Sequence, residues 1–285
     1  MKKTSKILAV VLVAVLAVAT LAIFAACGES GTVTGDCHYE NAWSAGKYYG
    51  VKVDVTVSGG KITAVKLYSE EETGWTRTSA DPWSTGLGHD KTEAAYEGWI
   101  EENIVGQKIA TVLGWQAVAD KGAQTVGKDV PHITGATQSS ARIIVAVQNA
   151  LCELKSVSLV TGEAKYENKW NAGSYYGAKV DVIVMGGKII NVRLYSEKET
   201  GWTRTSGTWT EGQNAGDLGF DKTEAAYASY LVDEIIGQKV KTVMSWEATA
   251  TQDAQTVGED VPHIAGATQS SARIIVAIQD ALGKL

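Results

Sequence analysis

The sequence has few basic residues for its length. Lysine and arginine number 26 against 32 aspartate and glutamate residues, which gives the 285-residue chain a net charge of -6. A protein that binds nucleic acid needs a basic surface to neutralise phosphates, so this balance argues against nucleic acid as a partner. Hydrophobic residues make up 45% of the chain, which is enough to fill the cores of folded domains.

Histidine is also scarce, and its placement argues against a metal site. The chain has 4 histidines, and His132 and His263 occupy equivalent positions in two similar segments without ligand-spaced partners. We therefore expect no metal, and we expect these two histidines to line a ligand pocket or to be structural. His89 is replaced by Phe220 in the second segment, which argues against a function of this histidine that both segments require.

The N-terminal segment lacks charge over a long apolar run. Lysines precede residues 7–26, which carry no charged side chain, a pattern typical of an export signal. The small residues before Cys27 resemble the lipobox of bacterial lipoproteins, in which the cysteine takes a diacylglycerol. We predict a lipoprotein signal peptide over 1–26, a lipid anchor on Cys27 and a tether over 27–35, at the extracytoplasmic face of the cell membrane. The alternative is a plain membrane anchor, because about 20 apolar residues also span a bilayer.

The rest of the chain is a duplication, since residues 39–151 recur as 166–282. A period this long indicates two tandem homologous domains instead of a solenoid. We assign the first domain, a linker and the second domain to residues 36–155, 156–162 and 163–285.

Each copy opens with the pattern of a β-hairpin. In the first copy, valines alternate with polar residues over 51–57, Gly59 and Gly60 supply the turn, and the chain returns over 62–68. The second copy repeats the pattern.

Helical patterns follow the hairpin. Asp90 and Glu93 form a capping pattern for a helix that ends at Gly106. Residues 138–151 place apolar side chains at helical spacing, which predicts a closing helix with one buried face. Strands followed by separate helices predict an α+β domain with a small antiparallel sheet.

The segment before the closing helix has the character of an anion site. Gly135 and Ala136 offer no bulk that would block a ligand, and Thr137 stands at the helix start. Backbone N–H groups and the positive end of the helix dipole converge there, which favours a phosphate. Ser139 and Ser140 add hydroxyl donors. The alternative is that these residues only cap the helix.

This segment, Thr134 to Thr137 with the two serines, resembles the Ser/Thr-Gly-Ala-Thr signature of the FMN-binding domain family. The family includes extracytoplasmic flavoprotein subunits of sodium-pumping quinone reductases and Rnf complexes. A Gly-Lys-Ile hairpin and a Glu-Thr-Gly segment agree with it, and the resemblance covers nearly all of both copies. In the family, a flavin transferase esterifies the last threonine to the FMN phosphate. The resemblance therefore implies two FMN groups, covalently held through Thr137 and Thr268.

The resemblance also implies a set of cofactor-binding residues. At the phosphate end these are Thr134, Gly135, Ala136, Thr137, Ser139 and Ser140, with Gly266, Ala267, Thr268, Ser270 and Ser271 in the second copy. At the ring end they are Thr73, Gly74 and Trp75, with Thr200, Gly201 and Trp202 in the second copy. We expect each tryptophan to stack on the flavin ring or to belong to the core. Arg77 and Arg204 either stabilise reduced flavin or lie solvated on the surface.

The sequence departs from the family's pattern at two places. Pro131 and Pro262 stand where the family has an aspartate, and Ala265 replaces the first residue of the second signature. Both departures weaken the case for covalent attachment, and the missing aspartates favour an alternative function, in which a surface module keeps the fold and binds another ligand without redox chemistry.

The resemblance as a whole implies an electron carrier that resembles the flavinylated lipoproteins of extracellular electron transfer. We expect FMN to take electrons from a quinol-linked membrane donor and to pass them to a partner or an extracellular acceptor. The sequence identifies no substrate of its own, so an enzymatic role is restricted to that of a flavin-dependent reductase component.

The remaining cysteines predict a disulfide. Cys37 and Cys152 are both missing from the second copy, where Ala164 and Gly283 stand. Joint absence is expected of bonded partners, and export permits oxidation. We predict a bridge between Cys37 and Cys152.

Overall fold

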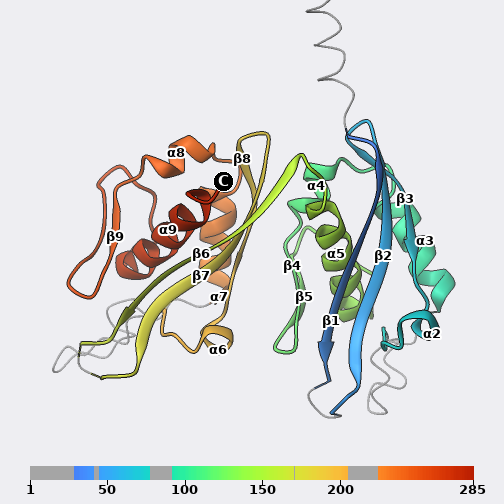
Figure 1. Cartoon of the computed structure of the whole chain (residues 1–285), viewed down its shortest axis with the longest axis horizontal. Coiled ribbons are helices and arrows are strands. Elements are labelled where there is room, and N and C mark those ends of the chain that lie inside the picture. The colour runs from blue at the N-terminus through green and yellow to red at the C-terminus, as the bar shows by residue number, and fades with distance from the viewer. Residues whose placement is uncertain (1–28, 42–44, 78–91, 170, 205–223) are drawn as a thin grey trace, which may run out of the picture. The chain divides into compact units, whose positions relative to one another are not determined.

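The computed structural model divides the chain into two compact units (Figure 1). It describes residues 29–41, 45–77, 92–169, 171–204 and 224–285. Unit 1 comprises Met1–Val112 and Ala117–Leu154, and unit 2 comprises Leu113–Gln116 and Lys155–Leu285. Each unit combines small antiparallel sheets with helices, so the predicted α+β class is confirmed.

Unit 1 is built on a three-stranded antiparallel sheet in the order β1-β2-β3. These strands are Gly31–Glu40, Tyr48–Ser58 and Lys61–Leu67. The predicted hairpin is confirmed, because Gly59 and Gly60 join β2 to β3 with φ angles of 59° and 75°, values that favour glycine. The alternating valines of β2 are buried, as the pattern predicts.

Unit 2 repeats this sheet with strands β6, β7 and β8, in that order. They span Val157–Glu167, Tyr175–Met185 and Lys188–Leu194. The first strand of each sheet precedes the predicted hairpin and was not predicted. Residues 31–35 pair with β2 instead of forming a tether, and residues 157–162 pair with β7 instead of forming a linker.

Helices and a short hairpin complete each unit. Unit 1 has α2 Glu70–Thr73, α3 Glu93–Asn103, α4 Ile109–Leu113, the hairpin of β4 Ala117–Ala119 and β5 Gln124–Val126, and α5 Thr137–Cys152. Unit 2 has α6 Glu197–Thr200, α7 Glu224–Tyr230, the π-helix η2 Leu231–Ile235, α8 Val240–Met244, β9 Ala248–Ala250, β10 Gln255–Val257 and α9 Thr268–Leu282.

The cap of α3 differs from the prediction. Thr92 is the N-cap residue, and its hydroxyl accepts a hydrogen bond of 3.2 Å from the Ala95 N–H. Glu93 is the first helical residue. The predicted cap residue Asp90 lies outside the described residues, as do His89 and Phe220.

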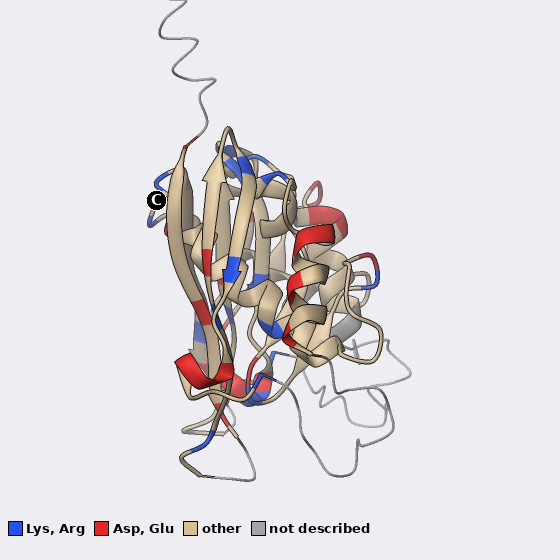
Figure 2. Cartoon of the chain, turned by 90° about the vertical axis from the view of Figure 1, so that its right-hand side faces the viewer, with Lys and Arg blue, Asp and Glu red and all other residues tan. Residues whose placement is uncertain are grey.

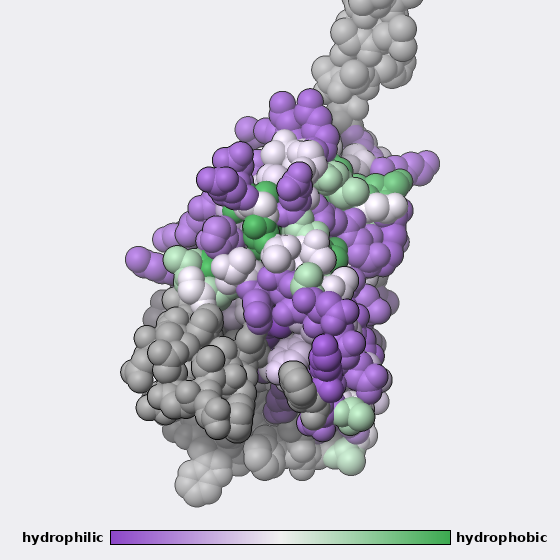
Figure 3. Space-filling view, turned by 90° about the vertical axis from the view of Figure 1, so that its left-hand side faces the viewer, coloured by the Kyte–Doolittle hydropathy of each residue, from purple (hydrophilic) through white to green (hydrophobic). Residues whose placement is uncertain are grey.

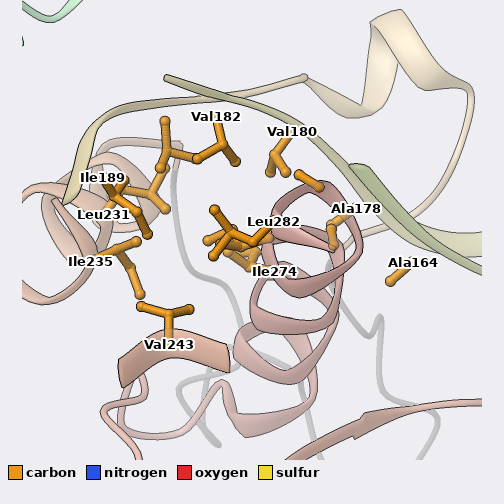
Figure 4. Close-up of a cluster of buried hydrophobic side chains, with 14 of the residues drawn as sticks. Ala164, Ala178, Val180, Val182, Ile189, Leu231, Ile235, Val243, Ile274 and Leu282 are labelled. Carbon is orange, nitrogen blue, oxygen red and sulfur yellow. The ribbon is translucent and has the colours of Figure 1, made fainter. Parts of the chain in front are cut away.

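The closing helices α5 and α9 are buried on most of their surface, so the predicted buried face is confirmed and is broader than the sequence pattern indicated. In unit 1 the sheet packs on one side of α5 and the β4-β5 hairpin packs on another. Figure 4 shows the equivalent core in unit 2, where Val180 and Val182 of β7 face Ile274 and Leu282 of α9. The less buried residues of α5 lie at helical spacing on one remaining stripe, which comprises Gln138, Val145, Asn149 and Cys152.

The predicted disulfide is wrong, because neither Cys37 nor Cys152 is bridged. The Cys37 Sγ donates a hydrogen bond of 3.2 Å to the Ala119 carbonyl on β4. Helix α5 runs antiparallel to β1, with Ala150 already against Gly35. Cys152, at the end of α5, therefore lies further from Cys37, toward the start of β1.

The surface is largely polar. Helices α2 and α3 carry seven glutamates and no lysine or arginine, and the acidic residues of unit 1 stand out in Figure 2. On the face drawn in Figure 3, hydrophobic residues lie among hydrophilic ones. Within the described ranges, no helix combines the length and apolar character that crossing a membrane requires. Cys27 and the predicted signal peptide lie outside those ranges.

Candidate functional site

The predicted phosphate end lies at the start of the closing helices. Gly135 and Gly266 have φ angles of 77° and 75°, in the left-handed region that favours glycine. The next residue, Ala136 or Ala267, is the N-cap and makes no side-chain hydrogen bond to the first turn. An N-terminus without a side-chain cap suits an anionic ligand, because the helix dipole is positive there.

The threonines stand where the sequence places them. Thr137 and Thr268 are the first residues of α5 and α9, with Thr137 exposed and Thr268 half-buried. Thr134 is exposed, as is Ala265 at the same position of unit 2. Both threonine side chains are therefore accessible at the helix start.

The serines of the signature hold the loop instead of facing outward. The Ser140 hydroxyl donates to the Ala136 carbonyl at 3.0 Å and accepts from the Ile133 N–H at 2.9 Å. Ser271 makes the same bonds to Ala267 and Ile264. The Ser139 hydroxyl donates to the Arg77 carbonyl, as Ser270 does to Arg204, both at 3.2 Å. All four serines are buried, so they position the turn, a role different from the phosphate donors we predicted.

The ring-end segment is shaped by a short capped helix. Ser69 and Glu72 form a reciprocal capping box on α2, and Gly74 follows with a φ angle of 69°. The Thr73 hydroxyl donates to the Ser69 carbonyl at 3.1 Å and accepts from the Trp75 N–H at 3.2 Å. In unit 2, Thr200 makes the same two bonds. The hydroxyl of this threonine thus sets the direction in which the tryptophan leaves the helix.

Each tryptophan lies on the sheet, against a glycine of the second strand. A Cβ atom at Gly50 would lie 2.9 Å from Trp75 Cε3, and a Cβ at Gly177 would lie 2.9 Å from Trp202 Cε3. Both tryptophans are half-buried. They are therefore not core residues, and they are partly accessible to a ligand.

Arg77 and Arg204 are buried, with 2% of each residue exposed, which excludes the solvated surface alternative. The Arg77 guanidinium donates to the Tyr68 carbonyl at 2.6 Å and pairs with Glu93. The Arg204 guanidinium donates to the Tyr195 carbonyl at 2.7 Å. These bonds fix the end of the ring-end segment.

A second buried arginine joins the two ends of the site. Arg142 is 1% exposed, and its guanidinium donates to the Arg77 carbonyl at 2.7 Å and to the Tyr39 hydroxyl at 2.8 Å. Arg273 donates to Arg204 and Tyr166 in the same way. Sequence reasoning missed these arginines, although their recurrence next to both signatures was a signal. They tie the helix start to the tryptophan segment, across 65 residues of chain in unit 1.

The tyrosines that receive these bonds stay neutral. Burial raises the pKa of the Tyr39 phenol, although Arg142 opposes this shift, and the pKa of Tyr166 is raised in the same way. A neutral phenol oxygen accepts the guanidinium N–H and leaves the arginine charge uncancelled. The buried Arg142 therefore keeps a positive charge next to the helix start, whereas Arg77 is paired with Glu93 and its backbone N–H donates to the Glu70 carboxylate.

His132 and His263 lie next to the helix start without a shared ligand set. In each, Nδ1 lies close to the carbonyl oxygen two residues earlier, at 3.1 Å and 3.0 Å. Both side chains are exposed. They belong to the rim of the phosphate end.

The residues present fit an FMN group. The glycine turn, the helix start and the buried arginine charge suit the phosphate, and the partly exposed tryptophan suits a flat ring. Among the described residues, the Arg77 Nε is buried with no hydrogen-bond partner within range.

Comparison with known proteins agrees with this geometry. Residues 46–152 match the model of the FMN-binding domain family. The match covers the hairpin, the ring-end segment, the buried arginines and the closing helix of unit 1. No curated protein and no solved structure matches the chain. The similarity to the FMN-binding domain family is thus shown for residues 46–152 of unit 1.

Proposed function

We propose that each unit holds one FMN, with its phosphate at the start of α5 or α9 and its ring beside Trp75 or Trp202. One observation carries the proposal to unit 2, which lies outside the family match. The serine and arginine bonds that join the two ends of the site in unit 1 recur in unit 2 on the same atoms. A site repeated at this level of detail supports the same ligand in both units.

The attachment point in each unit is the first threonine of the closing helix. A flavin transferase would use FAD as the donor, so that Thr137 or Thr268 Oγ1 forms a bond to the phosphorus of the FMN moiety. The pyrophosphate bond breaks, AMP leaves with the bridging oxygen, and the hydroxyl proton is lost. The accessible position of both threonines at a helix start supports this role.

The protein's function would then be electron transfer on the extracytoplasmic face of the cell membrane, with Cys27 carrying a lipid anchor. FMN supplies the redox chemistry when bound. A quinol-linked membrane donor would reduce the flavins, and a partner reductase or extracellular acceptor would oxidise them. The apolar run over 7–26 and the small residues before Cys27 support the location.

A second candidate function is ligand binding without redox chemistry. Pro131 and Pro262 stand where the family has an aspartate, which favours a module that the transferase does not modify. The two functions differ in one observable, the presence of flavin on the purified chain.

Two threonine variants test the proposal. The full chain, co-expressed with a flavin transferase, is denatured and its retained flavin is measured by visible absorbance and peptide mass spectrometry. We expect Thr137→Ala and Thr268→Ala each to lose one flavin, and Thr134→Ala to keep both, because unit 2 already has alanine at that position. Flavin that stays on a chain lacking both threonines would refute the attachment. Wild-type chain without any flavin would refute the proposed function.

A further inference from the structure

The two ring-end tryptophans are covered by different side chains. In unit 1 the His38 imidazole stacks on Trp75, with ring centroids 4.3 Å apart and an angle of 17° between the planes. In unit 2 the Lys165 ammonium lies over the Trp202 ring, 4.9 Å from its centroid. The same position of the repeat therefore carries an ionisable aromatic ring in one unit and a fixed cation in the other.

The surroundings of the two tryptophans are otherwise matched. Each approaches a glycine of the second strand to the same distance, as described for Gly50 and Gly177. The backbone N–H of each tryptophan donates a hydrogen bond to a threonine hydroxyl, at 3.2 Å in unit 1 and 3.1 Å in unit 2. The difference between the units is thus concentrated in the side chain that covers the indole.

Several charged or titratable groups face His38 in the described structure. On its own strand, Asp36 Oδ1 lies 2.8 Å from His38 Nδ1. On β2, the Tyr48 ring meets the imidazole edge-on at 6.0 Å, and Lys52 pairs in register with Asp36. In unit 2, Glu163 holds the position of Asp36, and Lys165 also lies 4.0 Å from the Tyr175 ring centroid.

We propose that His38 and Lys165 are positioning residues that make the two sites electrostatically unequal, so that the difference between the two units depends on pH. This inference rests on the proposed function, in which the tryptophans lie beside the flavin. A lysine side chain places an ammonium group on the Trp202 face in unit 2. An imidazole gains its charge only as the pH falls through about 8 to 5. A cation held on an indole face adds to the positive potential felt by a neighbouring ring.

The expected consequence is a pH-dependent difference between the two flavins. Positive charge stabilises the reduced, more electron-rich ring and so raises its reduction potential. The potential of the unit 1 flavin therefore rises relative to that of unit 2 as His38 becomes protonated.

The stacked pair is tested first without flavin, by NMR of the histidine rings in the full chain. Only 4 histidines are present, so His38→Lys assigns the His38 signals directly. We expect these signals to carry a ring-current shift that Trp75→Leu removes. Lys165→His should add a fifth histidine with the same signature from Trp202. His38 signals that do not respond to Trp75→Leu would overturn the stack.

The electrostatic consequence is tested on the flavin-loaded chain by spectroelectrochemistry between about pH 5.5 and pH 8. The proton dependence common to both flavins cancels in the separation of their midpoint potentials. We expect this separation to change with pH in the wild type and to stay constant in His38→Lys and in Lys165→His, which make the two positions alike. A separation that still changes with pH in His38→Lys would overturn the inference. Absence of flavin would instead contradict the proposed function, while the NMR comparison still decides the stack.

Discussion

At the scale of single residues, the site depends on side chains that bond to distant backbone carbonyls. Thr137 and the glycine before it could be predicted, because a helix start after a small-residue turn is a local property. The direction of the Ser139 and Ser140 hydroxyls could not, because their acceptors are set by tertiary packing. The recurrence of Arg142 and Arg273 marked them in the sequence, but their burial could not be predicted, since arginine is normally a surface residue.

The hydroxyl of Ser140 gives the clearest prediction at this scale. Ser140→Ala removes the acceptor of the Ile133 N–H, so we expect the free energy of unfolding of unit 1 to fall by about 1–2 kcal/mol. Urea denaturation measures the change. Thr134→Ala is the matched control, and because that side chain is exposed its effect should stay within about 0.5 kcal/mol. Equal effects of the two variants would contradict the assigned role of Ser140.

At the scale of elements, the position of the closing helix depends on one glycine in the first strand. A Cβ at Gly35 would lie 2.2 Å from the Ala150 backbone nitrogen, and a Cβ at Gly162 would lie 2.1 Å from the Ala277 carbonyl oxygen. The sequence suggested a tether over 27–35, because glycine, serine and threonine are typical of flexible segments. The glycine is needed there for close approach, which composition alone does not distinguish. The hairpin of β2 and β3 was predictable because alternation and turn chemistry are local.

Replacing this glycine should therefore be severe. We expect Gly35→Ala to lower the free energy of unfolding of unit 1 by about 3 kcal/mol, since the clash is with helix backbone that cannot move alone. Gly98→Ala on α3 is the control, because a Cβ there has open space and helical geometry. We expect Gly98→Ala to stabilise the helix by about 0.5–1 kcal/mol. Thermal or urea unfolding that ranks the two variants the other way would refute the close packing of α5 on β1.

At the scale of the whole molecule, the chain repeats one fold and one set of site contacts in two units. The duplication could be predicted from self-similarity at a fixed period. The sequence did not reveal that different side chains cover the tryptophans of the two units. The contacts of His38 and Lys165 with tryptophan depend on strand pairing, which the sequence alone does not give. The acidic helices α2 and α3 are a further difference, since α6 contains Lys198 where α2 has a glutamate.

Attachment to the membrane is tested by the cysteine at the end of the apolar run. We expect Cys27→Ser to block lipidation and processing, so that the chain keeps residues 1–26 and loses its lipid label. Metabolic labelling with a fatty acid and intact mass measure both changes. A wild-type chain that takes up no label yet stays in the membrane fraction would contradict the lipoprotein prediction and favour the plain anchor.

The central claim is that each unit carries an FMN at the start of its closing helix. The most direct measurement is the number of flavins per wild-type chain after co-expression with a flavin transferase, determined by intact mass and by absorbance. The account predicts two, one for each copy of the serine and arginine contacts. A chain that retains none would contradict it, and a chain that retains one would refute the equivalence proposed for unit 2.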